Sequence, residues 1–479
     1  MYLKKLSGLM FLLFVTSGFL SATEYTILVA DKGTDAYKSA KAMASASETT
    51  FVVGLRPGKG MSKLSKKASK VLNDPEKCQV YKSIRNPRIK WRVKNEKTCT
   101  VNIKIAHGNY GGGIGISVGL WPTTTLRILG GYDDSFKVRA PFKTPTIIRG
   151  GSTIVKMATG GKYNYLKELY VSGLFMDIAG GNKYDAKTNS IKKGESGSLP
   201  IISIQARGYL TTDRLVYADN VFINAPNKAI APLIRAMSKN TEVIIRNNFF
   251  INNVLAMLAD TANYHVYPKW YKIVGNSFIM NWPYNPDPTT SNAAAVEIAN
   301  KSRVRNYIIK DNLFAHNIGG ALFDNGPNLH SNTTIHHNLF FNNGGLFGET
   351  EPGAAAMVVK FGGFKNKDVP WNIMSVEDLE DEYEDEDEED QKVRGNSSVD
   401  PKIKIALVKP GYGNSGTISA KDTKMNDIRG ILGMNKQGGK MKISNYAPYS
   451  YADANTLPWP ANKAAKGFGV NPSRVEQFK

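Results

Sequence analysis

Short stretches in which apolar and polar residues alternate begin near Thr100 and recur along most of the chain. The segment VNIKIAHGNY places Val101, Ile103 and Ile105 on one face and polar residues on the other. Similar stretches follow in LRILGGYDDSFKVR, TIIRGG and LKELYVSGLF, each punctuated by Gly or Asn. A period of two predicts β-strands, and their close spacing leaves no room for crossover helices. The pattern therefore predicts an all-β chain.

Five of these stretches align as a repeat. They are LVYADNVFINA at 215–225, VIIRNNFFINN at 243–253, YKIVGNSFIMN at 271–281, YIIKDNLFAHN at 307–317 and TIHHNLFFNNG at 333–343. The last four share N-x-F-x-x-N, whereas the first has Ala225 in the final place. Steps between the first Asn residues are 28, 28, 36 and 26. Such a period indicates a solenoid, because no single repeat buries its own apolar face.

Stacked repeats place like residues over like residues. The apolar residue three positions before the first Asn, and the Phe two positions after it, are expected to face the core. The chain turns between them at the Asn, a residue that tolerates the left-handed conformation. We expect the stacked Asn side chains to form a hydrogen-bonded ladder along the axis.

The N-x-F-x-x-N coils resemble those of the parallel β-helix repeat family, within the pectin-lyase-like superfamily. LRILGGYDDSFKVR is similar to a segment near the start of bacterial secreted β-helix proteins, and VDPKI at 399–403 resembles the segment that closes their last coil. The resemblance covers residues 100–405 and implies a right-handed parallel β-helix. It does not specify an activity, because the superfamily includes lyases, hydrolases, epimerases and adhesins.

The N-terminus has the pattern of a signal peptide over residues 1–22. Lys4 and Lys5 precede an apolar run shorter than the roughly 20 residues of a membrane span, and Ser21 and Ala22 follow it. No later segment is apolar enough to span a bilayer. We therefore expect a secreted protein, whether extracellular, at the cell surface or periplasmic, and a monomer.

Residues 23–99 are predicted to be an N-terminal cap region. In MSKLSKKASKVLN, apolar residues recur at helical spacing, so the segment predicts a short amphipathic helix. Cys78 and Cys99 are the two cysteines, and in an oxidising compartment they are expected to form a disulfide. Residues 406–479, rich in Gly, Tyr and Pro, are expected to form an irregular C-terminal cap or an appended segment.

The charge pattern points to an anionic partner. The formal net charge is +21, although 12 of the 14 residues from Glu377 to Asp390 are acidic. Without this tract, 62 basic residues face 29 acidic ones, which favours an acidic polysaccharide or an anionic cell surface. The signal peptide and the lack of a binding module disfavour nucleic acid. The acidic insertion at 376–391 is expected to be a mobile, solvated loop; calcium binding and masking of a basic groove are the alternatives.

The alignment also predicts which side chains face outward. Alternation places the residues two positions before the Asn outside, namely Ala218, Arg246, Val274, Lys310 and His336. A lyase needs a cation to neutralise a uronate carboxylate and a base to take the adjacent proton. The candidate catalytic residues are Lys310, His336, Arg246, His337 and Asp311.

Other roles remain open at this point. The aromatic residues Tyr264, Trp270, Trp282 and Tyr284 are candidates for stacking against sugar rings, or for packing of the loops. No set of residues defines a metal site or requires a cofactor, with calcium left open. A polysaccharide lyase is the leading hypothesis, a glycoside hydrolase is the second enzymatic one, and a non-catalytic glycan-binding or structural envelope protein is the alternative.

Overall fold

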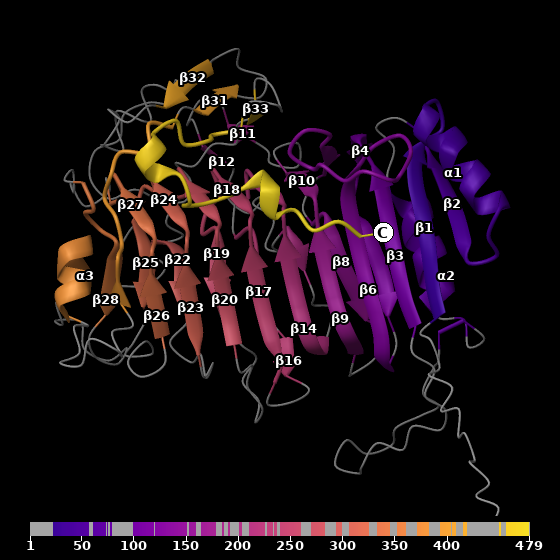
Figure 1. Cartoon of the computed structure of the whole chain (residues 1–479), viewed down its shortest axis with the longest axis horizontal. Helices are drawn as coiled ribbons and strands as arrows, with labels where there is room; N and C mark the ends of the chain where they lie inside the picture. Colours follow the sequence, from indigo (N-terminus) through magenta and orange to yellow (C-terminus); the bar gives the residue numbers. More distant parts are fainter. Residues whose placement is uncertain are drawn as a thin grey trace, which may run out of the picture.

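A computed structural model shows an all-β parallel solenoid, and strands predominate among the residues that it describes (Figure 1). It describes residues 23–56, 61–72, 74, 77–78, 99–118, 120–150, 153–159, 164–178, 184–185, 190–191, 201–203, 210–225, 228–232, 234–236, 240–259, 270–282, 294–298, 306–324, 333–344, 352–360, 371–382, 393–403, 405–408, 415–418, 450–451 and 457–478. The predicted signal peptide lies outside these residues. Within them, no helix has the length and apolar character needed to cross a bilayer.

Three parallel sheets form the sides of the solenoid, and most of its central coils contribute a strand to each. Sheet A has the order β2 (Thr50–Leu55), β1 (Thr23–Asp31), β3 (Cys99–Ala106), β6 (Leu120–Tyr132), β9 (Asn164–Ser172), β14 (Leu210–Ala218), β17 (Glu242–Arg246), β20 (Trp270–Val274), β23 (Tyr307–Lys310), β26 (Thr333–His336) and β30 (Val393–Arg394), with β16 (Ile234–Ala236) beside β14. Figure 1 shows its strands side by side, from indigo to orange.

Sheets B and C complete the coils. Sheet B has the order β27 (Leu339–Phe341), β24 (Leu313–Ala315), β21 (Ser277–Ile279), β18 (Phe249–Ile251), β15 (Val221–Ile223), β10 (Leu174–Asp177), β7 (Thr146–Arg149) and β4 (Gly108–Gly111). Sheet C is in two parts, one of β13 (Ile202–Ser203), β8 (Val155–Thr159) and β5 (Ile114–Val118), the other of β19 (Met257–Ala259), β22 (Ala294–Ile298), β25 (Gly320–Asp324), β28 (Met357–Lys360) and the antiparallel β29 (Trp371–Met374).

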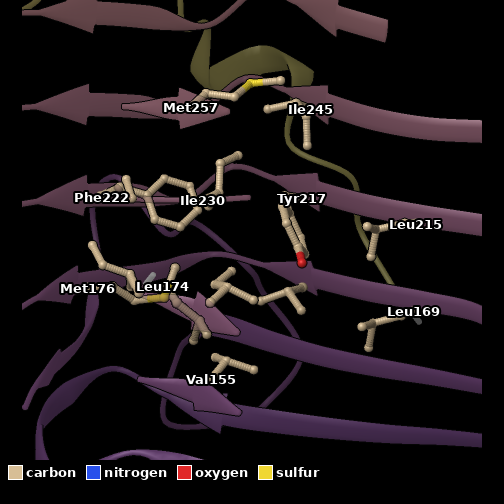
Figure 2. Packing of buried hydrophobic residues seen from close by; sticks show 14 of the residues in the cluster. Val155, Leu169, Leu174, Met176, Leu215, Tyr217, Phe222, Ile230, Ile245 and Met257 are labelled. Atoms are coloured by element: carbon tan, nitrogen blue, oxygen red, sulfur yellow. The ribbon is translucent and has the colours of Figure 1, made fainter. Parts of the chain in front are cut away.

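The interior is built from columns of identical or similar side chains. Phe222, Phe250, Phe278, Phe314 and Phe340 stack with ring centroids 4.7–5.1 Å apart and are fully buried. This spacing equals the separation of neighbouring strands, so each ring lies over the next. Figure 2 shows Phe222 and Tyr217 pointing into the same interior as Leu215 and Ile245. The predicted inward face of the repeat is confirmed.

The predicted Asn ladder is present. Oδ1 of Asn276 accepts hydrogen bonds from both the backbone N and Nδ2 of Asn248, at 3.0 and 2.9 Å. Nδ2 of Asn276 donates in turn to Asn312 and to the backbone oxygen of Ile245. A second ladder links Asn253, Asn281, Asn317 and Asn343. These fully buried amides satisfy one another along the axis, which removes the cost of burying them.

The left-handed turn residue is not the ladder Asn, contrary to the expectation from sequence. The residue just before it has the positive φ, with values of 54–64° in the aligned coils, at Asp219, Asn247, Gly275, Asp311 and His337. We call these five residues the turn column. The ladder Asn itself must extend its amide along the axis, so the preceding residue makes the turn.

The N-terminal region does more than cap the first coil. Strands β1 and β2 extend sheet A in register with β3, so the parallel sheet begins at Thr23 and not at Thr100. Helix α1 (Asp35–Ser45) packs Ala36 and Ala40 against the outer face of this end. Helix α2 (Ser62–Leu72) confirms the predicted amphipathic helix, with Leu64, Ala68 and Leu72 buried.

The predicted disulfide is also present. Cys78 and Cys99 are bonded, with their Cα atoms 5.5 Å apart, and neither cysteine of the chain is free. Cys99 opens β3 and Cys78 follows α2. The bond therefore ties the end of the helical cap to the sheet.

The start of the acidic insertion is ordered, which corrects the expectation of a loop. Helix α3 (Val376–Glu382) buries Leu379 fully, and Oε1 of Glu380 accepts hydrogen bonds from the backbone N and Nδ2 of Asn396. Asp378 caps the start of the helix through Ser375. Placing one Leu among the acids gives the segment a face to pack, so it covers the last coil.

The C-terminal region has two parts. Strands β31 (Ile405–Val408), β32 (Ser415–Ile418) and β33 (Ser450–Tyr451) form a small antiparallel sheet, as do β11 (Tyr184–Asp185) and β12 (Ser190–Ile191) elsewhere. Residues 457–478 include the 3₁₀ helices η5 (Lys463–Ala465) and η6 (Pro472–Arg474). Figure 1 shows this yellow segment running back along the solenoid to end near β3 and β6.

Candidate functional site

The predicted outward column forms a continuous row across sheet A. Strand register pairs Ala218 with Arg246, Arg246 with Val274, Val274 with Lys310, and Lys310 with His336. His336 then pairs with Arg394 of β30, the next residue of the row. Neighbouring members therefore lie about one strand spacing apart, roughly 4.8 Å. We call Lys310, His336 and Arg394 the cationic row.

Arg394 is not part of the five aligned repeats. It belongs to a sixth coil, VRGN at 393–396, in which Gly395 takes the left-handed turn and Asn396 extends the ladder from Asn338. The order Val-Arg-Gly-Asn matches Ile-Val-Gly-Asn around Gly275 and is the sequence pattern that identifies this coil. The coil is hard to recognise because Ser398 replaces the Phe and 58 residues separate the two ladder Asn residues.

Lys310 and Arg394 differ from most cations on this face because they have no counter-ion. Arg127 and Arg214 both pair with Glu168, at 3.4 and 2.8 Å, and Lys272 pairs with Glu242 at 2.8 Å. Within the part of the chain that the structure describes, no carboxylate lies within 4.0 Å of the amine of Lys310 or the guanidinium of Arg394. Among the described residues, the row therefore carries positive charge that no carboxylate neutralises.

His336 lies between these two cations, and its imidazole is partly buried. Burial lowers its pKa below the usual value, and the positive charges of Lys310 and Arg394 lower it further, with Asp311 opposing them. The ring is consequently neutral at neutral pH and has a lone pair available. The row thus presents a cation, a base and a second cation on three adjacent strands.

Two interacting side chains of the turn column, Asp311 and His337, lie beside the cationic row. Nδ1 of His337 is 2.6 Å from Oδ1 of Asp311, and half of the His337 side chain is exposed. The ring of Phe468 stacks on His337 with centroids 4.5 Å apart. The five candidate catalytic residues thus fall into two groups: Lys310, Asp311, His336 and His337 lie together, whereas Arg246 is three strands away from His336.

Arg246 is already occupied. Its guanidinium lies 2.7 Å from Oε2 of Glu476 and 2.6 Å from the hydroxyl of Tyr170. No sequence pattern indicates this contact, because 230 residues separate the two partners and no repeat includes Glu476. Arg246 is therefore not a free cation of the cationic row.

The candidate aromatic residues do not form one platform. Trp282 is only 1% exposed, belongs to the apolar cluster between sheet B and the C-terminal segment, and donates Nε1 to Asn252 at 2.9 Å, so its ring has no face for a sugar. Trp270 lies partly exposed at the start of β20, with the amine of Lys272 5.7 Å from its ring centroid. Tyr264 and Tyr284 lie outside the described residues.

The described residues contain no group of three or more His, Cys, Asp or Glu side chains suited to hold a metal ion. Comparison of the chain with protein-family models, with curated proteins and with solved structures gave no match. The residues of the site are therefore the only basis for inferring a function.

Proposed function

We propose that this protein binds an acidic polysaccharide along the cationic row and cleaves it by β-elimination. The observation that carries the proposal is the order of Lys310, His336 and Arg394, two cations that lack counter-ions among the described residues, on either side of a neutral imidazole. The basic balance of the chain outside the acidic tract supports a polyanionic ligand.

Each member has a part in the reaction. Lys310 or Arg394 pairs with a uronate carboxylate, which makes the hydrogen on the adjacent carbon more acidic. The imidazole of His336 takes that proton as the base. The electron pair left on carbon forms a double bond, the glycosidic bond to the neighbouring carbon breaks, and the departing oxygen takes up a proton.

Non-catalytic glycan binding is the second candidate, and one observation favours it. Among the described residues, the His336 side chain makes no hydrogen bond that would fix its orientation. A catalytic base is usually oriented by a further group. In this second case the row holds the polymer and the protein acts as a surface or adhesin-like binder.

Family and location are part of the same proposal. The stacked N-x-F-x-x-N coils support membership of the pectin-lyase-like superfamily, with a right-handed coil. The disulfide between Cys78 and Cys99 supports export to an oxidising compartment. A secreted protein with a partly exposed cationic row has access to cell-surface and matrix polysaccharides.

The test is the ultraviolet absorbance of the unsaturated product, followed over a panel of acidic polysaccharides with and without calcium. We expect a rise with one polymer class, lost in His336→Gln and lowered about a hundredfold in Lys310→Ala, since each removes one required element. Lys63→Ala, which removes an exposed lysine of α2, is the matched control. Binding without any absorbance rise supports the second candidate, and neither binding nor cleavage contradicts both.

A further inference from the structure

The C-terminal segment 468–478 crosses the coils one after another along the turn column. Phe468 stacks on His337, the backbone N of Gly469 donates to the backbone oxygen of Asp311 at 2.7 Å, and the backbone N of Asn471 donates to Asn247 Oδ1 at 2.7 Å. The segment passes Gly275 where a side chain would collide with Arg474. Phe468 lies on the coil of β26 and Glu476 contacts Tyr170 of β9, so the segment crosses five coil spacings of about 4.8 Å.

Near the end of this segment, the carboxylate of Glu476 lies among hydrogen-bond donors on sheet A. Oε2 of Glu476 accepts a hydrogen bond of 2.9 Å from the Tyr170 hydroxyl and one of 2.7 Å from Arg246 Nη2. Arg246 Nη2 also donates to the Tyr170 hydroxyl at 2.6 Å. Burial raises the pKa of Tyr170, so its phenol keeps the proton that it donates. A phenol and a guanidinium that converge on one oxygen form a carboxylate-binding site.

An aromatic ring lies beside this carboxylate. Phe478 packs edge-on against Tyr170 with centroids 5.0 Å apart, and the guanidinium groups of Arg127 and Arg139 lie 5.2 and 5.8 Å from its centroid. The Glu476 side chain is 48% exposed and that of Arg246 24%. The donors therefore belong to the body of the solenoid, whereas the group that occupies them is half-exposed and close to the end of the chain.

Arg246 also lies on the same line as the cationic row. The register runs from Arg246 through Val274 and Lys310 to His336, three strand steps or about 14 Å. A polymer with regularly spaced carboxylates, laid along the axis over Lys310 and Arg394, reaches Arg246 when extended in that direction. Glu476 occupies the position that its next carboxylate would take.

We propose that Arg246 and Tyr170 form a second carboxylate subsite for the acidic polysaccharide, and that Glu476 fills this subsite until the polymer displaces residues 476–478. The inference rests on the proposed function for the identity of the ligand. The ligand class is a uronate chain long enough to bridge the subsite and the cationic row. Displacement costs the chain the ion pair of Glu476 with Arg246, the hydrogen bonds that Arg139 makes with Glu476 and Gln477, and the packing of Phe478, so the subsite selects long polymers over short ones.

The test is calorimetric titration of the full-length protein with oligouronates of graded length. In Glu476→Gln we expect the affinity for long oligomers to rise about tenfold, the worth of one charge-assisted hydrogen bond, and that for the shortest to stay unchanged. The gain should vanish in the double variant Arg246→Ala with Glu476→Gln. Glu48→Gln, an exposed glutamate of the N-terminal region, is the matched control, and a thermal melt confirms folding of each variant.

The two proposals fail in different ways. Equal affinity of wild type and Glu476→Gln for every length, with binding still lowered by Lys310→Ala, overturns the second subsite and leaves the proposed function intact. Length-dependent binding to Glu476→Gln that needs Arg246 but not Lys310 or Arg394 overturns the proposed function and supports the subsite. Binding of no oligomer to either protein overturns both.

Discussion

Asp311 and His337 lie on neighbouring coils, and Oδ1 of Asp311 is 2.6 Å from Nδ1 of His337. Both residues have left-handed backbone, with φ of 58° and 54°, at the turn that follows sheet A. The carboxylate assigns the proton of the imidazole to Nδ1 and leaves Nε2 as the acceptor. The turn column, where the chain changes direction, thereby also places a hydrogen-bonded Asp–His pair beside Lys310 and His336.

Lys310 should contribute to the low pKa of His336. Burial is the main cause that lowers this pKa and the charge of Lys310 is the next, so Lys310→Met should raise the pKa of His336 part of the way back towards its usual value. The measurement is an NMR titration, which six histidines keep tractable. Lys63→Met is the control, and an unchanged pKa in Lys310→Met would show that the two side chains do not interact.

The lowered pKa of His336 makes the free energy of unfolding depend on pH. The folded-state pKa of His336 lies below its unfolded value, so the unfolded chain takes up this proton first as the pH falls. The contribution is therefore complete above the unfolded pKa, near 6.5, and is lost as the pH drops below it. Urea midpoints measured between neutral and mildly acidic pH should fall less steeply in His336→Gln than in wild type. Parallel curves for the two proteins would contradict this.

The Asn ladder yields a large predicted loss of stability. Asn276→Ala removes an acceptor shared by two donors of Asn248 and leaves Oδ1 of Asn312 with one donor fewer. Unsatisfied buried groups cost about 1–3 kcal/mol each, so we expect at least about 3 kcal/mol of destabilisation in urea unfolding. Thr334→Ala, on the outer face of β26, should change little. A loss below about 1 kcal/mol in Asn276→Ala would mean that water replaces the amide.

Removing the hydroxyl of Tyr217 should not lower stability, in contrast to the removal of the Asn276 side chain. Tyr217 is 1% exposed, and among the described residues nothing accepts or donates a hydrogen bond to its hydroxyl; Figure 2 shows that group inside the apolar core. Burial raises its pKa strongly, so it remains neutral. Tyr217→Phe should keep or raise the unfolding midpoint, because it removes a buried polar group without a partner. A clear drop would reveal a partner that the hydroxyl has in solution.

Arg139 should stabilise both the core and the attachment of the C-terminal segment to it. It and Asp219 form an ion pair with no exposed side-chain surface, and Nη1 of Arg139 also donates to the backbone oxygen of Glu476 at 2.8 Å. Arg139→Ala leaves a buried charge without its partner, which costs about 3–5 kcal/mol. It should also speed tryptic cleavage after Arg474. In the double variant Arg139→Met with Asp219→Asn, which removes both charges and keeps a residue that tolerates the left-handed turn, stability should partly return while fast cleavage persists.

Much of the fold was readable from the sequence because each coil repeats its core. Ile245, Ile273 and Ile309 recur at one position and Phe at another, so the columns, the ladder and the outer row through Lys310 and His336 follow from alignment alone. The contact of Glu476 with Arg246 could not be read in this way, because it forms once and joins segments that share no pattern. Arg394 lies between these cases, since its coil keeps the turn but not the Phe.

The most direct test of the central claim is the salt dependence of binding to an acidic polysaccharide, compared between wild type and the Lys310→Ala/Arg394→Ala double variant. If the cationic row is the binding surface, wild-type affinity falls steeply as salt rises, because exposed charge pairs are screened. The double variant should then bind more weakly at low salt and with a shallower dependence. Equal affinity and equal salt dependence in the two proteins would contradict the account, because the polymer would then be held elsewhere.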